Sequence, residues 1–351
     1  MEFKVLRCLL EVRSEEGVTE EIEEGLEEGL EGKEVEGRRE EAEEAEEAEE
    51  KEEGNGALEV FERWEREPKG KKRKKDYKLM KVERYVFDDL TLQTLYKLAQ
   101  RRIIAGIGGP ISTGKESIVF HAIGGSAAGS GEVREVSGEE VREERQREVA
   151  VKIYKVSTSN FKAMLEYILG DPRFENVKKD RRSVVFTWAR KEFKNLKRAF
   201  RAGVSVPAPI AYEKNVLVMD FIGSEGIPAP RLRDVPEEIL RPHAQHIFER
   251  ILANVKVLYE KAGLVHADLS EFNILLDFKM EGGEEERGSE EIPASALSSA
   301  RPVLIDMGQA VLTSHPKAMD FLQRDLRNIV AFFQKLGLNL SHEDVCKEIL
   351  S

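Results

Sequence analysis

Three side chains in two short segments have the chemistry needed to transfer a phosphoryl group. Asp268 and Asn273 stand five residues apart in His-Ala-Asp-Leu-Ser-Glu-Phe-Asn, just before an apolar run. Asp306 ends another apolar run, in Ile-Asp-Met-Gly. Phosphoryl transfer needs a carboxylate beside the attacking hydroxyl or water, and oxygen ligands for Mg²⁺ nearby. Asp268 could be that carboxylate and the other two could bind the metal, whereas Asp306 taken alone could equally belong to a turn.

A lysine inside an apolar segment suggests how phosphates would be held. Lys152 interrupts the strand expected at 149–154, so its ammonium is expected to point into a crevice. Glu192, on an amphipathic helix expected at 188–202, is its expected counter-ion. A Lys–Glu pair that orients the α- and β-phosphates is the arrangement of protein kinases. The alternative is an ordinary ion pair at the surface.

A glycine-containing stretch fits most of a phosphate-binding pattern. Residues 109–115 match the first seven places of Gly-x-x-x-x-Gly-Lys, but the eighth place holds Glu116 instead of Ser or Thr. The next residues, 117–123, alternate like a strand and do not open a helix, which a Walker loop needs to hold phosphates. This segment is therefore predicted to be a turn that covers phosphates, with Ser112 and Lys115 as the residues that contact the nucleotide.

The periodicity of apolar residues predicts the elements that place these side chains. Helices are expected from a cap at Asp88 or Asp89 to about residue 100, and at 188–202, 237–262, 316–336 and 342–350. Strands are expected at 117–123, 149–154, 216–221, 274–278 and 303–305, and a turn-rich stretch at 106–114. Strands with one helix are thus followed by a mainly helical half. This order predicts an α+β fold of two lobes, with the ligand site in the crevice between them.

The charge is distributed unevenly along the chain. Residues 15–53 hold 21 glutamates against four basic residues, a net charge of −17, whereas the whole chain carries −12. We expect residues 1–78 to be a disordered acidic tail and basic linker, because this composition cannot form a packed core. The catalytic domain is expected at 79–351, with lobes at about 79–222 and 223–351 and with polar insertions at 124–148 and 281–300.

Other features of the composition exclude several classes of protein. Cys8 and Cys346 are the only cysteines, so a disulfide framework is excluded and a reducing compartment is expected. No apolar run approaches the roughly 18 residues of a membrane span. The chain is expected to be soluble and cytoplasmic.

In chain order, these segments resemble the RIO family of atypical serine/threonine protein kinases, and its first, archaeal-type branch in particular. The resemblance rests on three motifs, namely Ser-Thr-Gly-Lys-Glu at 112–116, the His-Ala-Asp-Leu-Ser-Glu-Phe-Asn segment, and Ile-Asp-Met-Gly-Gln at 305–309. It extends over about residues 85–351. It implies a two-lobed, protein-kinase-like fold with a strand-rich N-lobe and a reduced helical C-lobe that lacks an activation segment.

The resemblance also implies roles for individual residues. Lys152, paired with Glu192, contacts the phosphates of ATP, and Asp268 is the catalytic acid or base. Asn273 and Asp306 bind Mg²⁺, which Mn²⁺ could replace, and Asp306 can itself become phosphorylated. The adenine is held by backbone groups around Asp220 and Ile222, with Met219 behind the ring.

The resemblance implies that the chain acts as a kinase and ATPase in maturation of the small ribosomal subunit, with a ribosomal subunit precursor as its partner. A non-catalytic, nucleotide-sensing ribosome-binding factor is an alternative, although the full set of catalytic residues argues against it. A small-molecule kinase of the aminoglycoside-phosphotransferase type is another, and Ser-Thr-Gly-Lys-Glu argues against that. The basic run at 69–75 favours a solvated linker over an RNA contact.

Overall fold

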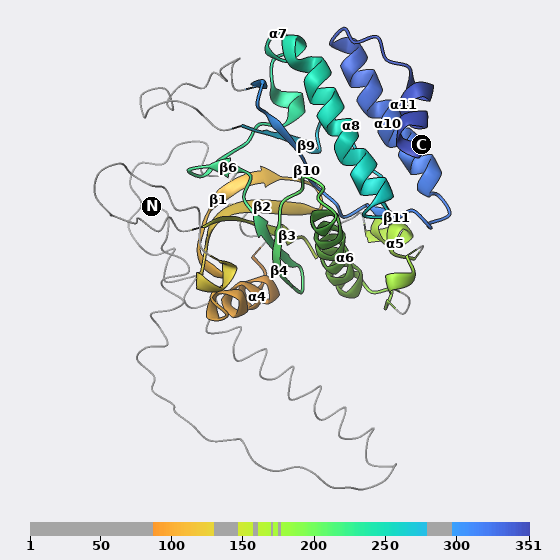
Figure 1. The fold of residues 1–351 in the computed structure, drawn as a ribbon. Coiled ribbons are helices and arrows are strands. Elements are labelled where there is room, and N and C mark those ends of the chain that lie inside the picture. The colour runs from red at the N-terminus through yellow and green to blue at the C-terminus, as the bar shows by residue number, and fades with distance from the viewer. Residues whose placement is uncertain (1–86, 130–146, 157–160, 170, 175–176, 279–296) are drawn as a thin grey trace, which may run out of the picture.

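A computed structural model describes residues 87–129, 147–156, 161–169, 171–174, 177–278 and 297–351. The tail and basic linker expected at 1–78, and most of the two expected insertions, lie outside these residues. An antiparallel sheet with its helices forms one part of the fold, and a mainly helical part packs beside it (Figure 1). The predicted α+β fold of two lobes is confirmed.

The N-lobe is built on one five-stranded sheet of the order β1-β2-β3-β5-β4, all antiparallel. Its strands are β1 (Ile104–Thr113), β2 (Ser117–Gly124), β3 (Glu148–Tyr154), β4 (Pro209–Glu213) and β5 (Val216–Asp220). Alternate residues of β3 face opposite sides, as the pleat requires. Val151 packs in an outer core with residues of α4 (Asp89–Gln100), whereas Ala150 faces the main core shared with the C-lobe.

Helix α6 (Arg181–Arg201) joins the two lobes, and α5 (Phe161–Leu169) packs against it. The Asp180 carboxylate accepts a hydrogen bond from the Ser183 amide and so caps the first turn of α6. This cap explains why the helix begins seven residues before the expected start at residue 188. The sequence patterns did not predict helix α5.

The C-lobe is mainly helical. Its helices are α7 (Glu237–Leu240), α8 (Ala244–Glu260), α10 (Ala318–Lys335) and α11 (His342–Leu350). Its short strands pair as β6 (Gly223–Ser224) with β7 (Ile227–Pro228), β8 (Leu264–Val265) with β11 (Val311–Leu312), and β9 (Ile274–Asp277) with β10 (Arg301–Leu304). Only residues 307–317, which include β11, separate Asp306 from α10, and this leaves no room for an activation segment there.

Two expected elements differ from the structure. The turn expected at 106–114 is most of β1, whose pairing with β2 shifts register around Pro110. Glycine and proline mark β-bulges as well as turns, and composition does not separate the two. The single helix expected at 237–262 is divided into α7 and α8 by a 3₁₀ turn at Arg241–His243, which contains Pro242.

Candidate functional site

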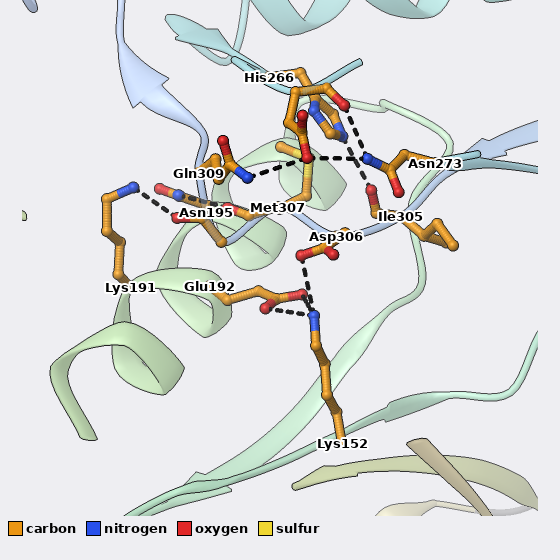
Figure 2. Close-up of polar contacts among 12 residues, drawn as sticks. Lys152, Lys191, Glu192, Asn195, His266, Asn273, Ile305, Asp306, Met307 and Gln309 are labelled. Carbon is orange, nitrogen blue, oxygen red and sulfur yellow. Dashed lines mark hydrogen bonds and ion pairs between the residues drawn. The ribbon is translucent and has the colours of Figure 1, made fainter. Parts of the chain in front are cut away.

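Three charged side chains from three elements meet between the lobes. The Lys152 ammonium of β3 lies 2.9 Å from each carboxylate oxygen of Glu192 on α6. The same nitrogen lies 3.1 Å from Oδ1 of Asp306, which follows β10 (Figure 2). The side chains of Lys152 and Glu192 are buried, whereas that of Asp306 is 49% exposed. In the part of the chain that the structure describes, Asp306 is therefore the member of this cluster that a phosphate could approach from solvent.

Electrostatics keep Lys152 and Asp306 charged. Burial alone would lower the pKa of Lys152, but the carboxylates of Asp306 and Glu192 outweigh burial and raise it well above its usual value. Burial raises the pKa of Asp306, but the adjacent ammonium outweighs it and the net pKa is lowered. The cluster thus presents a fixed cation beside a carboxylate that is ionised at neutral pH.

The Asp268 carboxylate lies nearby and is held by two side-chain amides. Its Oδ2 accepts a hydrogen bond from Nε2 of Gln309 at 3.0 Å and a longer one from Nδ2 of Asn273 at 3.3 Å. Nδ2 of Asn273 also donates to the Asp268 carbonyl at 2.8 Å. Partial burial, and after it the charge of Asp306, raises the pKa of Asp268 to about 6. A carboxylate with such a pKa is well suited to accept a proton near neutral pH.

The segments that carry Asp268 and Asp306 are joined to each other through His266. Nε2 of its imidazole lies 3.0 Å from the Ile305 carbonyl, to which it can only donate (Figure 2).

The segments that carry Asp268 and Asp306 each contain a residue in the left-handed backbone region, namely Ala267 at φ 64° and Asp306 at φ 63°. Such conformations are costly for residues other than glycine and tend to gather at functional sites.

Asp325 of α10 supports the segment that contains Asp268. It is buried, and its carboxylate accepts hydrogen bonds from the amides of Ala267 at 2.8 Å and Leu269 at 3.0 Å. These are the two residues that flank Asp268. The C-lobe helix therefore fixes the backbone on both sides of the reactive carboxylate.

Replacing Asp325 by asparagine is expected to remove a pH-dependent part of the stability. Burial raises the pKa of this carboxyl from 3.8 to about 7, so the folded state binds a proton that the unfolded state releases. The contribution is full below pH 3.8 and is lost as the pH rises towards about 7. The measurement is urea unfolding at about pH 5 and about pH 8 in both proteins. An unfolding free energy that changes equally in both would contradict this assignment.

Helix α6 also holds the segment that follows Asp306. Nζ of the buried Lys191, whose pKa burial lowers to about 7, donates to the carbonyls of Gly308 at 2.7 Å and Ala310 at 2.6 Å. Nδ2 of Asn195 donates to the carbonyls of Met307 at 2.9 Å and Ala310 at 2.8 Å. Figure 2 shows both side chains reaching this segment from the helix that bears Glu192. One helix therefore positions Lys152, through Glu192, and the backbone that carries Asp306.

Close packing against α6 explains the glycine in Ile-Asp-Met-Gly. A Cβ built on Gly308 would lie 2.8 Å from Nε1 of Trp188, a ring of α6 that is itself buried. A side chain at this position would push the segment away from the helix. The glycine is needed here for close approach and not for its backbone angle.

The remaining predicted residues lie at the edge of the cleft. Ser112 and Lys115 are exposed where β1 turns into β2, and no contact between them and the charged cluster is seen in the part of the chain that the structure describes. Met219 is buried at the inner face of β5, and Asp220 ends that strand with its carboxylate paired to Arg147. The Ile222 carbonyl accepts a hydrogen bond from the Ala229 amide. Of the ten predicted site residues, the structure therefore brings together Lys152, Glu192, Asp268, Asn273 and Asp306. The other five, described in this paragraph, lie at the edge of the cleft.

Two oxygens near the cluster fit a magnesium ion. Asn273 uses its amide nitrogen towards Asp268, and its amide oxygen has no hydrogen-bond partner among the described residues, so it could act as a ligand. Asp306 adds a carboxylate that the neighbouring lysine keeps ionised. Mg²⁺ favours hard oxygen ligands and commonly takes one or two from the protein and the rest from phosphates and water.

Several supporting residues carry no motif of their own in the sequence. For Asp325 a signal existed, because it interrupts the apolar spacing of Leu322, Leu326 and Ile329 on α10. A buried carboxylate on an apolar helix face must be hydrogen-bonded, although periodicity does not say to what. Lys191 and Asn195 look like ordinary polar residues of an amphipathic helix, and only the fold shows where they point.

Comparisons with known proteins identify the family of this chain. A family model described as the RIO domain matches residues 138–281 and 296–345. The RIO-type serine/threonine-protein kinase Rio1 of Haloferax volcanii is 42% identical over 75% of this chain and 75% of its own. The protein of that name from Methanocaldococcus jannaschii is 36% identical over 77% of each chain. No helix among the described residues is long and apolar enough to cross a membrane.

One solved structure among the similar ones is the Rio2 kinase–ADP/Mg²⁺–phosphoaspartate complex from Chaetomium thermophilum. It is 24% identical, with a TM-score of 0.49, and the match covers 74% of this chain and 66% of that one. The family model and the two archaeal relatives identify the family of this chain. The chain belongs to the RIO family of serine/threonine-protein kinases.

Proposed function

We propose that this chain transfers the γ-phosphoryl group of ATP and acts as a kinase and ATPase switch in maturation of the small ribosomal subunit. The observation that carries the catalytic part is the position of Lys152, which bridges Glu192 and Asp306 beside a carboxylate of raised pKa. The ribosomal part comes from the family resemblance. Nucleotide-sensing without turnover is the weaker alternative, because every charged group that turnover needs is in place.

Each group has a role that follows from its surroundings. Lys152, held by Glu192, binds oxygens of the phosphates and neutralises their charge. Asp268, oriented by Gln309 and Asn273, accepts the proton of the attacking hydroxyl or water. Its raised pKa matches the proton affinity that this step needs near neutral pH.

Asn273 and Asp306 would hold Mg²⁺, or Mn²⁺ in its place, which would offset charge on the phosphates. The adenine would lie against Met219, with the backbone of Asp220 and Ile222 at its edge. Ser112 and Lys115 would cover the phosphates from the turn between β1 and β2. The adenine and metal placements come from the family resemblance, and the buried position of Met219 and the exposed positions of Ser112 and Lys115 are compatible with it.

Asp306 offers a second way to use the γ-phosphoryl group. A carboxylate oxygen of Asp306 would bond to the γ-phosphorus as the bond to the leaving oxygen of ADP breaks, which gives an acyl phosphate. Water, deprotonated by Asp268, would then release inorganic phosphate. With no activation segment after Asp306 to hold a peptide, water is a natural acceptor.

Incubation with ATP and Mg²⁺ is expected to label the protein covalently. The label should be sensitive to hydroxylamine, because acyl phosphates are, and mass spectrometry should locate it on Asp306. Asp234→Ala, which removes an exposed carboxylate paired with Arg231, is a matched control that should keep the label. A label found only on serine or threonine, under conditions that preserve acyl phosphates, would rule out the aspartyl phosphate and leave direct transfer.

The ribosomal part of the proposal has its own test. The protein is expected to sediment with precursors of the small ribosomal subunit, and ATP should change the bound fraction because hydrolysis resets the switch. The slowly hydrolysed analogue AMP-PNP should hold the bound state. A bound fraction that is the same with ATP, AMP-PNP or no nucleotide would contradict a nucleotide-driven switch.

A further inference from the structure

The outward face of α6 carries cations that the catalytic cluster does not use. We call Arg182, Arg190, Lys194, Lys197 and Arg201 the basic face of α6. All are exposed except Lys194, which is half-buried. Residues 190, 194, 197 and 201 repeat at three- and four-residue spacing and so follow one side of the helix. The buried side of the same helix holds Lys191, Glu192 and Asn195 against the site.

The charge of the basic face is not neutralised by the described part of the protein. None of the five side chains forms an ion pair with a carboxylate among the described residues. Lys194 and Lys197 instead lie over the rings of Phe174 and Phe193, at 4.9 and 5.9 Å from the ring centres. An aromatic ring attracts an ammonium without cancelling its charge, so the cation can still meet an anionic ligand.

Other cations on the surface do have acidic partners. Lys256 pairs with Glu260, Arg301 with Asp277 and Lys347 with Asp344. Outside the glutamate-rich segment at 15–53 the chain has a small excess of basic residues, because that segment carries −17 of the total charge of −12. What sets the basic face of α6 apart is therefore that its cations lack the acidic partners that these other cations have.

The first turn of α6 adds to the argument. Arg181 and Arg182 begin the helix and Lys178 and Lys179 precede it, so the N-cap Asp180 is the acidic residue among four cations. The positive end of the helix dipole favours acidic residues, so these cations oppose helix stability whereas Asp180 supports it. The pKa of Lys194 is lowered, first by burial and then by the positive charges of Arg190 and Arg173. These side chains gather positive potential along the first half of α6.

We propose that the basic face of α6 binds the phosphate backbone of a single-stranded RNA segment. Phe200, 51% exposed, lies about one turn after Lys197, next to these cations. Cations beside an exposed aromatic ring suit a strand whose phosphates pair with the cations while a base stacks on the ring. An acidic peptide would use the cations but would leave Phe200 without a role. The inference deepens the proposed ribosomal function. It rests on that function only for the identity of the RNA, since RNA binding itself is argued from the side chains of α6.

The nearest competitor for this surface is the chain's own glutamate-rich segment at 15–53. Its charge of −17 could meet the same cations. The two occupants differ in what they need. RNA binding should depend on Phe200 as well as on the cations, whereas binding of the glutamate-rich segment should depend on the cations alone.

The test uses the full-length chain and a fluorescein-labelled single-stranded RNA of mixed sequence, with fluorescence anisotropy over a range of salt concentrations. The triple variant Arg190→Gln/Lys197→Gln/Arg201→Gln removes three cations of the basic face. The triple variant Lys256→Gln/Arg301→Gln/Lys347→Gln removes three that have acidic partners. Both change the net charge equally, so non-specific attraction should weaken equally in both.

The α6 variant is expected to lose on the order of 10²-fold in RNA affinity near 0.1 M salt, and its salt slope should fall by about 2, since each phosphate contact contributes about 0.7. The control variant should stay close to wild type. Phe200→Ala should weaken binding about fivefold or more without changing the slope. ATP turnover without RNA should be unchanged in the α6 variant, so a failure of RNA binding is distinguishable from a failure of catalysis.

Two results would overturn the inference. Equal losses in both triple variants would mean that RNA senses only the net charge of the protein. Absence of RNA binding by the wild type, together with binding of a synthetic 15–53 peptide that the α6 variant loses, would assign the surface to the chain's own acidic segment.

Discussion

Asp268→Ala is expected to slow release of the γ-phosphate by about 10²–10⁴-fold, the usual contribution of a general base. The affinity for ATP should stay near that of the wild type, because Asp268 faces Gln309 and Asn273 and makes no contact with Lys152 among the described residues. The measurement is single-turnover γ-phosphate release with ATP bound to excess enzyme.

Two controls distinguish a loss of catalysis from a loss of folding in this test. Asp234→Ala removes an exposed carboxylate of the C-lobe and should turn over at the wild-type rate. Nucleotide binding followed by fluorescence should be the same in Asp268→Ala and wild type, which would show that the cleft is intact. Wild-type turnover in Asp268→Ala would remove this residue from the mechanism.

Lys152→Met is expected to damage both nucleotide binding and stability. Glu192 is buried and has Lys152 as its charged partner, so the variant leaves a buried carboxylate without compensation. Removing one member of a buried ion pair typically costs about 3–5 kcal/mol. The affinity for ATP should fall as well, because the phosphates lose the ammonium that neutralises them. Urea unfolding and nucleotide titration measure the two effects separately.

The double variant Lys152→Met/Glu192→Leu separates the two causes. It removes the uncompensated carboxylate, so most of the lost stability should return, because a buried pair can often be replaced by apolar groups of similar size. ATP binding should not return, since no cation remains at the phosphates. A double variant that recovers ATP binding would show that Lys152 acts only through packing.

Much of the site could be predicted from the sequence because its chemistry is local. Asp268 and Asn273 lie on one loop, and that loop sets their separation almost independently of the rest of the fold. The pairing of Lys152 with Glu192 joins residues 40 positions apart. It could be predicted because a lysine inside an apolar strand needs a buried counter-ion, and few carboxylates lie on apolar helix faces.

What could not be predicted depends on tertiary packing. The contacts of Asp325 with the Ala267 and Leu269 amides join residues 58 and 56 positions apart, and no spacing rule connects them. Strand β1 was expected to be a turn because its glycines and proline interrupt the alternating pattern of a strand. The β-bulges in its pairing with β2 accommodate these residues. Periodicity gives the faces of an element but does not say which neighbour each face will meet.

The contacts between α6 and residues 307–310 bear on the design of inhibitors. A compound that binds by swinging this segment out of the cleft must break two hydrogen bonds from Lys191 and two from Asn195. Burial lowers the pKa of Lys191 to about 7, so its bonds are counted as those of a neutral amine, and the four hydrogen bonds together are worth about 2–6 kcal/mol. The conformation that binds such a compound would then be rare, and its apparent affinity would fall by about one to four orders of magnitude. Selective compounds for this protein should therefore fill the cleft with the segment in place.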